Sequence, residues 1–498
     1  MRVSRAFAVF ASLMFCLALA TAQQGWPDYA HDAQHSALSD VASQSLAKIH
    51  WRARVDLDPP LGEIFIHYGS PLITTANTVI VPVKTGSDSF RVDAHKGSDG
   101  TLLWRQSTNY QAPEATFMPS FSPVLSHNRL YIPAAGGVVL VRENPDQPSG
   151  TVLRMAFFGL ANYDANPQAY DSNVQINTPI TADAKGNIYF GFLVLGLTPV
   201  PLQSGLARIS ADGTGSWVSA ANAAHDPQIT GVNMCSAPAL SHDESMVYVG
   251  VDNPLSEFGY LLSLNSQTLH TNAKVRLKDP SSGLDALIFD ASSASPTVGP
   301  DGDVYMGVIE NPFPDHNDRG WLLHFDSTLS QSKIPGSFGW DDTVSIVPAS
   351  AVSSYKGTSS YLLMTKYNNY AGIGTGDGVN KIAILDPNAT EPDPILSSVA
   401  VMNEVLTIKG VTPDPDFPQF PGAVREWCIN TAAVDPSTKS VLANSEDGKL
   451  YRWDLTTNRF SQRITLSSGI GEAYTPTVIG PDGTVYAIND AVLFAIGK

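Results

Sequence analysis

Cysteine and positive charge are both scarce in this sequence, and each scarcity excludes a class of protein. The 498 residues include three cysteines, and only Cys235 and Cys428 lie beyond the N-terminal region. Two thiols cannot form the disulfide framework that stabilises many exported domains, so a large core must supply the stability. The 30 Lys and Arg residues are outnumbered by 47 Asp and Glu residues, which gives a formal charge of −17. Because no basic stripe is available to neutralise phosphates, we expect no nucleic-acid partner.

Long hydrophobic runs are also missing, apart from a short one at the N-terminus. The first 22 residues, MRVSRAFAVFASLMFCLALATA, begin with Arg2 and Arg5, continue with an apolar stretch and end in small residues. This pattern is typical of a secretory signal peptide and too short for a strong transmembrane helix. The sequence therefore predicts a signal peptide at residues 1–22, a secreted or periplasmic mature chain at residues 23–498, and no transmembrane segment.

What the sequence does contain is an internal repeat. SPTVGPDGDVY at Ser295–Tyr305 and TPTVIGPDGTVY at Thr475–Tyr486 are nearly the same, which indicates a repeated structural unit. Each copy begins with a small residue and a proline at the start of an apolar strand, where a residue without an N–H donor is tolerated. A search for this start finds eight copies, at Ser70, Ser122, Thr178, Ala237, Ser295, Val347, Thr431 and Thr475, with Ala432 replacing the proline in the seventh.

Further β-rich runs follow each copy, such as NTVIVPV, FRVDAH and GTLLWRQS after the first, and predict a four-stranded antiparallel meander. Such sheets repeated around a ring form a β-propeller. The last unit ends at Lys498 after its third strand, and AKIHWRARV at Ala47–Val55 offers the missing fourth. We therefore predict an all-β fold: a single eight-bladed β-propeller domain closed by an N-terminal strand that completes the C-terminal blade. Seven blades is the main alternative, and a stack of β-sandwiches fits less well.

Two stretches carry a resemblance to a known family. WPDYAHDAQHSALS at Trp26–Ser39 looks like an opening segment of that family, and VDAHKGSDGTLLW at Val92–Trp104 looks like its motif for packing one blade onto the next. With them the chain resembles the PQQ-like (quinoprotein alcohol dehydrogenase-like) β-propeller repeat family. The resemblance implies the fold but no single activity, because the family includes quinone-dependent dehydrogenases and also non-enzymatic propellers such as an outer-membrane assembly lipoprotein.

The residues of a quinone enzyme are not evident. The resemblance implies adjacent cysteines over the cofactor and calcium ligands beneath it, but the chain has no Cys-Cys pair, no calcium motif that we can place and no C-x-x-C-H haem motif. We therefore predict no cofactor, and PQQ with calcium stays open as an alternative. Cys235 and Cys428 precede different innermost strands, so we expect two buried thiols rather than a disulfide.

Two polar clusters could hold a metal ion, but a structural interpretation fits each better. His31, Asp32 and His35 have no evident further ligand, and we expect them in an N-terminal clasp on the propeller surface. DHNDRG at Asp315–Gly320 begins like a calcium loop without its closing acidic residue, so we expect a polar hairpin between a second and a third strand. No metal site is predicted.

The segments that lead into the innermost strands should converge at one mouth of the central channel, where polar and aromatic groups would make a ligand site. The predicted members are His67, Tyr68, Gln175, Asn177, Asn233, Asp341, Asp342, Glu426, Trp427, Glu472 and Tyr474. The alternative is that these groups bond to one another and seal the channel.

The sequence thus predicts an exported, monomeric binding or scaffolding module. Its partner would be an envelope or extracellular protein, or a small-molecule or carbohydrate ligand. The alternative is an enzyme with its site at the mouth, either a PQQ-dependent oxidoreductase or a carbohydrate hydrolase or lyase, and no catalytic residue is assigned.

Overall fold

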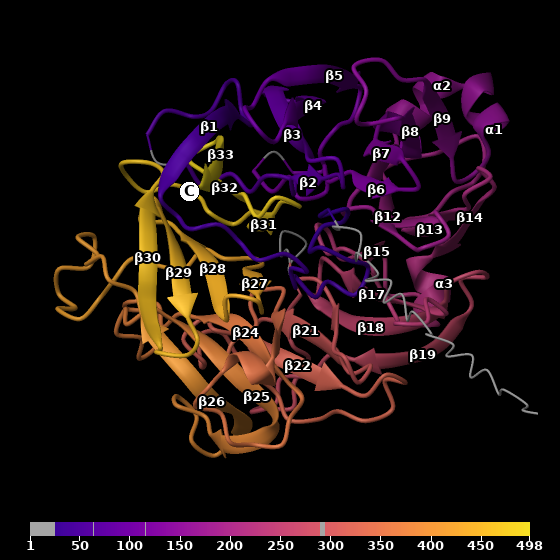
Figure 1. Cartoon of the computed structure of the whole chain (residues 1–498). Coiled ribbons are helices and arrows are strands. Elements are labelled where there is room, and N and C mark those ends of the chain that lie inside the picture. The colour runs from indigo at the N-terminus through magenta and orange to yellow at the C-terminus, as the bar shows by residue number, and fades with distance from the viewer. Residues whose placement is uncertain (1–24, 63, 115, 289–293) are drawn as a thin grey trace, which may run out of the picture.

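Eight antiparallel sheets surround a central axis as the blades of a propeller (Figure 1). The computed structural model describes residues 25–498 apart from 63, 115 and 289–293, so the predicted signal peptide at residues 1–22 lies outside the described residues. From residue 72 onward the chain passes through the blades in sequence order, and within each blade it runs from the channel toward the rim. The predicted all-β, eight-bladed propeller is confirmed.

The first half of the ring consists of four blades, whose strands follow one another from the channel outward. Blade 1 has β2 (Leu72–Ile73), β3 (Thr78–Gly86), β4 (Ser89–Lys96) and β5 (Leu102–Thr108), and blade 2 has β6 (Val124–Ser126), β7 (Arg129–Pro133), β8 (Val138–Glu143) and β9 (Val152–Ala156). Blade 3 has β10 (Val174–Ile176) and β11 (Thr181–Ala182), both paired with β12 (Ile188–Val194), then β13 (Gly205–Ile209) and β14 (Gly215–Ser219). Blade 4 has β15 (Gly231–Val232) and β16 (Ala239–Leu240), both paired with β17 (Met246–Asn253), then β18 (Phe258–Asn265) and β19 (Thr271–Arg276).

The second half of the ring continues in the same way. Blade 5 has β20 (Thr297–Val298), β21 (Val304–Val308) and β22 (Trp321–Phe325), and blade 6 has β23 (Ser345–Pro348), β24 (Tyr361–Tyr367), β25 (Lys381–Pro392) and β26 (Ala400–Lys409). Blade 7 has β27 (Ala433–Asp435), β28 (Ser440–Ser445), β29 (Lys449–Asp454) and β30 (Arg459–Thr465), and blade 8 has β31 (Val478–Ile479), β32 (Val485–Asn489), β33 (Val492–Gly497) and β1 (Lys48–Arg54). In blade 5, Ser332 and Gly336 form single bridges to β22 in the place of a regular fourth strand.

Short helices occupy two connections between blades, which the strand pattern does not predict. The helices α1 (Leu160–Ala165) and α2 (Pro167–Asp171) join blade 2 to blade 3, and α3 (Ala220–Ala224) joins blade 3 to blade 4. The side chain of Ser219 caps α3 by accepting a hydrogen bond from Asn222 N. Of the described residues, none forms a helix that is long and apolar enough to cross a membrane.

The two ends of the chain meet in the last blade. The strand β1 pairs antiparallel with β33, from Lys48 opposite Gly497 to Arg54 opposite Val492. Trp51 of β1 then donates a hydrogen bond from Nε1 to Gly97 O of blade 1, at 2.8 Å. The predicted closure is confirmed, and it removes an exposed sheet edge while tying both ends of the fold to the ring.

In blades 1, 2, 4, 5 and 6 the small residue that precedes the innermost strand joins neighbouring blades. Ser70 N donates to Ser122 Oγ at 3.0 Å, and Ala237 N donates to Ser295 Oγ at 2.8 Å. Ser295 N donates in turn to Thr343 Oγ1 at 3.0 Å. A hydroxyl of one blade thereby accepts a hydrogen bond from a buried N–H of the preceding blade. This bond explains why Ser or Thr often stands at this position of the repeat.

The start of the sixth copy was placed wrongly by the sequence. Val347 and Pro348, taken as its small residue and proline, lie at the end of β23. Thr343 occupies the equivalent position, because it accepts the hydrogen bond from Ser295 and is followed directly by the strand. The error arose because Val344 stands where most copies have the proline.

Residues 26–44 run once around the axis at the end of the channel where the innermost strands terminate, and we call them the N-terminal plug. They bond to the innermost strand, or to the turn after it, in every blade. The bonds run from Trp26 N to Ile73 O, Leu125 N to Pro27 O, Ala182 N to Asp28 Oδ2, Leu240 N to Ala33 O, Val298 N to Gln34 O, Ile346 N to Ser36 O, Val434 N to Ala37 O and Gln44 N to Gly483 O, at 2.7–3.2 Å.

The plug corrects the expectation of a clasp on the propeller surface. Trp26, Tyr29 and His35 are at most 1% exposed, so the segment is part of the channel interior. His35 Nδ1 lies 2.7 Å from Pro296 O, and Asp32 Oδ1 accepts the N–H of Ser36 within the plug. These polar residues hold the segment in the ring.

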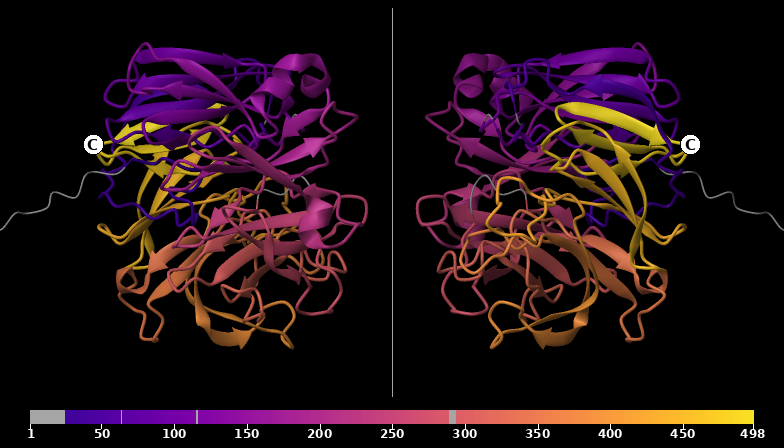
Figure 2. Two further views of the ribbon diagram at one scale, coloured as in Figure 1. Left: turned by 90° about the vertical axis from the view of Figure 1, so that its right-hand side faces the viewer. Right: turned by 90° about the vertical axis from the view of Figure 1, so that its left-hand side faces the viewer.

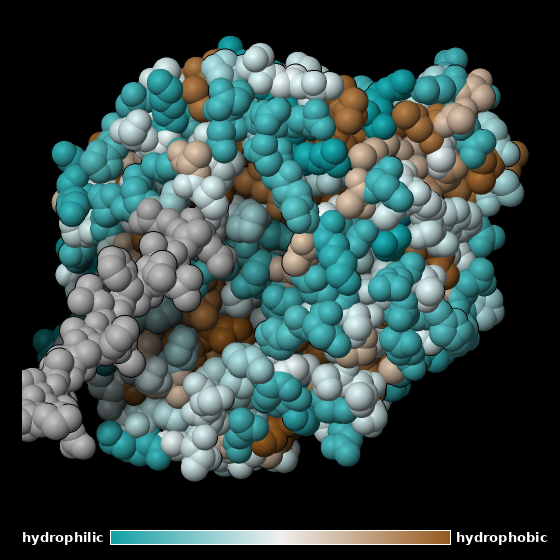
Figure 3. Space-filling model, turned by 45° about the vertical axis from the view of Figure 1, so that its right-hand side comes forward, coloured by the Kyte–Doolittle hydropathy of each residue, from teal (hydrophilic) through white to brown (hydrophobic). Residues whose placement is uncertain are grey.

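The C terminus lies on the same side of the ring as the plug, as the edge-on views show (Figure 2). Lys498 N donates to Gln44 Oε1 at 3.1 Å. An oblique view of this side and of the blade edges shows a mainly hydrophilic surface with small, separate hydrophobic areas (Figure 3).

Candidate functional site

The other end of the channel, which we call the mouth, lies opposite the plug. The segments leading into the innermost strands meet there with the loops after the second strands, because neighbouring strands in a blade run in opposite directions. Side chains from blades 6, 7 and 8 and from the segment before blade 1 form a group at this end, which we call the mouth cluster. Its members are His67, Asp341, Asp342, Lys366, Glu426, Cys428, Glu446, Glu472 and Tyr474.

His67 and Tyr474 form the first part of the cluster. Their rings are stacked with centroids 4.1 Å apart and an interplanar angle of 10°. His67 Nε2 lies 3.2 Å from Glu472 Oε2, and both side chains are buried. The backbone fixes these positions, since Glu472 N donates to Ile64 O at 2.8 Å and His67 N donates to Thr116 O at 2.9 Å. The contacts therefore connect the leading segments of blades 8, 1 and 2.

Lys366 supplies a buried positive charge. It lies near the end of β24, in an otherwise mostly apolar strand, and is 2% exposed. Its Nζ donates to Tyr474 Oη at 2.6 Å and lies 4.4 Å from the centroid of the same ring. The ring of Trp340 lies 5.9 Å away on another side. A buried lysine requires such polar and aromatic partners, because an isolated ammonium group is costly to bury.

Glu426, Cys428 and Glu446 form the second part of the cluster. One carboxylate oxygen of each glutamate and the Cys428 Sγ all lie within 4.8 Å of one another, a spacing that suits the ligands of one metal ion. Glu426 N donates to Glu446 Oε1 at 2.9 Å, and Cys428 Sγ donates to Glu446 Oε2 at 3.6 Å. Glu426 and Cys428 lie two residues apart in the extended segment before β27, so they share one side of it, and Glu446 follows β28.

Burial and like charges raise the pKa values of these carboxyl groups into the neutral range. Burial, together with the negative charge of the nearby Glu446, raises the pKa of Glu426 to about 8. Burial also raises the pKa of Glu446 to about 7, against the hydrogen bond from Glu426 N. The pKa of Asp342 is raised to about 7 by burial, although Lys366 opposes the shift. Each of these protons could be displaced by a positively charged ligand.

Six of the eleven predicted mouth residues lie in the cluster, and two others point away from it. Tyr68 Oη donates to Asp56 Oδ2 at 3.1 Å, and Asp56 also lies 3.5 Å from Lys84 Nζ. Trp427 packs instead into the core of blade 7, with its ring 5.5 Å from that of Tyr451. It alternates with Glu426 and Cys428 along an extended segment, so its side chain faces the opposite way.

The remaining three predicted residues lie in blades 3 and 4. Gln175 is half-buried in β10. Asn177 O accepts the N–H of Cys235 at 2.8 Å, and the Asn177 amide donates to Val232 O at 3.0 Å. The Asn233 amide is 1% exposed, and neither its oxygen nor its nitrogen has a hydrogen-bond partner among the described residues.

Lys366 and Glu446 were missed by the sequence prediction, which considered only the segments before the innermost strands. Both belong to second strands or follow them directly, and these reach the mouth from the opposite direction. A lysine inside the strand YLLMTKY was the available signal for Lys366. Cys428 was noted only as a buried thiol.

The two cysteines are not joined in a disulfide, as expected. Cys235 is buried as expected, whereas the expectation of a buried thiol was wrong for Cys428, which is partly exposed. The loop Asp315–Gly320 joins β21 to β22, so the predicted hairpin between a second and a third strand is confirmed.

Comparison with solved structures supports the fold. No family model and no curated protein sequence matches the chain. The europium-containing methanol dehydrogenase aligns with a TM-score of 0.57 and 10% identity, over 93% of this chain and 89% of that one. Quinohemoprotein alcohol dehydrogenase from Comamonas testosteroni aligns with a TM-score of 0.54 and 11% identity, over 95% and 81%. Sqt1 of Saccharomyces cerevisiae aligns with 0.51 and 11%, over 92% and 100%. The resemblance to the PQQ-like propellers is thereby confirmed at the level of the fold.

The mouth cluster does not fit the quinone cofactor that this resemblance implies. PQQ carries several carboxylates and calls for cationic partners, whereas Lys366 and His67 face a larger number of acidic side chains in this cluster. The adjacent cysteines that the resemblance implies are missing from the sequence, and Cys235 and Cys428 lie in the leading segments of different blades. We derive no chemistry from PQQ for this chain.

Proposed function

We propose that this protein is an exported binding protein that holds a positively charged ligand in the mouth of its propeller. The observation that carries the proposal is the convergence of Glu426, Cys428 and Glu446, with ligand atoms within 4.8 Å of one another, at the end of the channel opposite the plug. Its export is supported by the predicted signal peptide at residues 1–22.

The charge of the cluster favours a cation over an anion. Glu426 and Glu446 repel each other when both are ionised, and protonation removes this repulsion. A positively charged group bound between the two carboxylates would remove it as well. A metal ion or an organic ammonium or guanidinium group meets this requirement. Binding should therefore release protons in the neutral range and strengthen as the pH rises through the pKa values of these carboxyl groups, about 7 to about 8.

Calorimetric titration tests this proposal. The probes are Zn²⁺, N-acetyl-lysine amide and N-acetyl-arginine amide, each titrated in two buffers with different ionisation enthalpies to count released protons. At least one probe should bind with proton release, and Glu446→Gln should weaken that binding about tenfold or more, since it removes a charged partner. The matched control is Glu143→Gln in blade 2, whose carboxylate is 33% exposed in a pair with Arg129.

Two results would overturn the proposal: none of the probes binds, or Glu446→Gln binds as the natural protein does. Proton release that persists in Glu446→Gln would show that the cation binds at a site other than the Glu446 carboxylate.

An enzyme at the mouth is the second candidate, favoured by one observation. With a pKa raised by burial to about 8, Glu426 keeps a proton that it can donate at neutral pH, as a general acid does. A carbohydrate hydrolase or lyase would lose turnover in Glu426→Gln. A quinone oxidoreductase would reduce a dye in the presence of alcohol after addition of PQQ and calcium.

A further inference from the structure

The exposed large apolar side chains gather on the face of the ring that carries the mouth. In the described part of the chain, three of these exposed side chains belong to outer strands, namely Leu102, Val152 and Leu153. The others lie in loops on the mouth face: Leu57, Leu61, Phe65, Leu195, Leu197, Leu255, Leu284, Phe313 and Val411. Among the described residues, no exposed large apolar side chain lies in a hairpin on the plug side. Single exposed apolar residues are ordinary, but their confinement to one face marks an interaction surface.

Five of these side chains follow one another through three adjacent blades, and we call them the apolar arc. They are Leu195 and Leu197 in blade 3, Leu255 in blade 4, Leu284 before blade 5 and Phe313 in blade 5. Leu197 and Leu255 are each 96% exposed, so almost their whole side chains are available to a partner.

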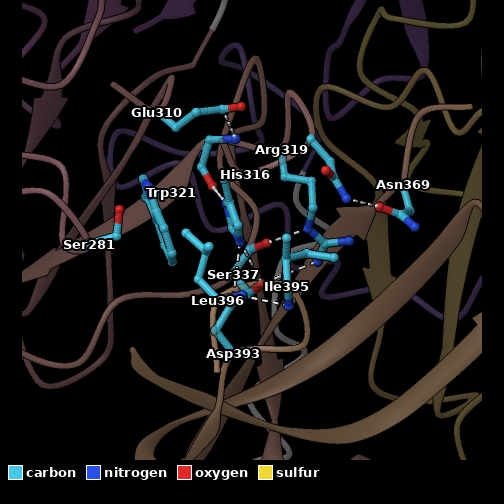
Figure 4. A network of polar contacts seen from close by, with 12 residues as sticks. Ser281, Glu310, His316, Arg319, Trp321, Ser337, Asn369, Asp393, Ile395 and Leu396 are labelled. Carbon is cyan, nitrogen blue, oxygen red and sulfur yellow. Dashed lines mark hydrogen bonds and ion pairs between the residues drawn. The ribbon is translucent and has the colours of Figure 1, made fainter. Parts of the chain in front are cut away.

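The loop that carries Phe313 is held in place by a buried polar network (Figure 4). The Glu310 carboxylate accepts the N–H groups of Asp318 at 2.7 Å and Gly320 at 2.8 Å. His316 stacks on Trp321 with ring centroids 3.8 Å apart. A side chain presented by a fixed loop loses little freedom when it binds, which is the property of an anchor residue.

The network also ties this loop to blade 6. His316 Nε2 lies 3.1 Å from Asp393 Oδ2, and Arg319 donates from Nη1 to Asn368 O at 2.8 Å. Asn368 in turn accepts the N–H of Trp427 and donates to Trp427 O, beside Glu426. The loop of Phe313, at one end of the arc, is therefore connected through buried hydrogen bonds to the residue next to Glu426.

Charge narrows the choice of partner. The arc and the acidic groups of the mouth cluster lie on the same face of the ring, and the whole chain has a formal charge of −17. A second copy would bring two acidic mouths together, and an anionic membrane would repel the same face. A basic group surrounded by apolar ones is complementary to both features.

We propose that the mouth face docks a protein partner through a segment with a lysine or arginine side chain flanked by apolar residues. The basic side chain enters the mouth cluster, and the flanking residues cover Leu197, Leu255 and Phe313. This inference rests on the proposed function, because it identifies the cationic ligand as part of a polypeptide.

Selection from a random peptide display library tests the inference. Peptides selected on the natural protein should be enriched in lysine or arginine between apolar residues. Synthetic copies of the selected peptides should bind the double variant Leu197→Ser/Leu255→Ser about tenfold or more weakly. The matched control is Leu153→Ser, because Leu153 is 41% exposed on an outer strand of blade 2 and should leave binding unchanged.

The outcomes separate this inference from the proposed function. Selected peptides without such enrichment, or equal binding by the double variant, would overturn the inference, while small cations could still bind at the mouth. Cosedimentation with anionic vesicles that the double variant loses would overturn it in favour of a membrane. A dimer in light scattering that the double variant lacks would overturn it in favour of a second copy. If neither peptides nor small cations bind, both proposals fail.

Discussion

The Nζ atom of Lys366 lies 2.6 Å from the hydroxyl oxygen of Tyr474, and this hydroxyl donates in turn to Asp341 O. The pair joins the second strand of blade 6 to the leading segment of blade 8. It also places a positive charge within the acidic cluster. Burial raises the pKa of both Glu426 and Asp342, and the charge of Lys366 opposes this rise. Lys366 thus stabilises the ionised carboxylates, as a bound cation would also do.

The first prediction concerns the removal of that charge. In Lys366→Met the pKa values of Glu426 and Asp342 should rise by about one unit, because a nearby opposite charge no longer stabilises the carboxylates. The titration of carbon-13-labelled carboxyl groups, followed by NMR, measures this. Lys356→Met is the control, since Lys356 is an exposed residue before β24 whose ammonium group donates to Ser353 O. Unchanged glutamate titration in Lys366→Met would contradict the electrostatic role.

The second prediction concerns stability and pH. Burial raises the pKa of Glu426 from 4.5 to about 8, and those of Asp28 and Asp342 from 3.8 to about 7. The folded state then binds more protons than the unfolded state, so this stability is fully present below about pH 4 and is lost as the pH rises through 7 and 8. The melting temperature should be several degrees higher at about pH 5 than at about pH 9.

A variant isolates the contribution of the mouth. Glu426→Gln/Glu446→Gln should flatten this pH dependence, because amides do not titrate, and Glu143→Gln should leave it as it is. A melting temperature that rises from mildly acidic to alkaline pH would contradict the prediction.

The repeat and the ring closure could be predicted because they depend on short-range patterns. Alternating strands, turn residues and the unpaired last unit are all visible in the sequence, and β1 pairs with β33 as expected. The path of the plug could not be predicted in the same way. Trp26 and Gln34 bond to blades 1 and 5 through backbone groups, which every sequence possesses and no motif marks.

The mouth was only half predictable for a similar reason. Its position follows from the topology, and Glu426 and Glu472 were found on that basis. Whether a side chain turns toward the axis depends on the residue's place in an extended segment, so Glu426 and Cys428 face the mouth while Trp427 enters the core of blade 7. Distances between blades, such as that from Lys366 to Tyr474, follow from packing and are not written in any local pattern.

The third prediction concerns the buried pair His316 and Asp393. Both side chains are fully buried, with Nε2 and Oδ2 3.1 Å apart. Burial raises the pKa of Asp393, but the His316 side chain and the hydrogen bonds from Leu396 N and Ser337 together outweigh this effect, and the pKa falls to about 2. Asp393→Asn should destabilise the protein by about 3–5 kcal/mol in urea unfolding, because the imidazole loses its charged partner inside the protein. The asparagine keeps an oxygen for the N–H groups of Ile395 and Leu396, which Asp393 Oδ1 accepts.

An exposed pair provides the comparison. Asp285 is 30% exposed and pairs with Arg276, so Asp285→Asn should cost about 0.2–1 kcal/mol. Equal costs for the two substitutions would show that the His316–Asp393 pair is not charged. The contribution of Asp393 should disappear as the pH falls from about 4 to about 2, since its pKa is lowered in the folded state.

The fourth prediction concerns the plug. Deleting residues 23–46 removes a hydrogen-bonded segment from every blade and should lower the melting temperature sharply and expose the ring to proteolysis, because the inner strands lose partners for buried backbone groups. The control deletes residues 1–22 alone and should leave stability unchanged.

Two smaller variants keep the test informative if the deletion does not fold. Trp26→Ala, at a side chain with no exposure, should cost about 3–5 kcal/mol. Tyr29→Phe removes the hydroxyl that donates to Asn430 Oδ1 and should cost about 1 kcal/mol. Wild-type stability in both variants would mean that the plug only lines the channel, and that the blades hold the ring closed without it.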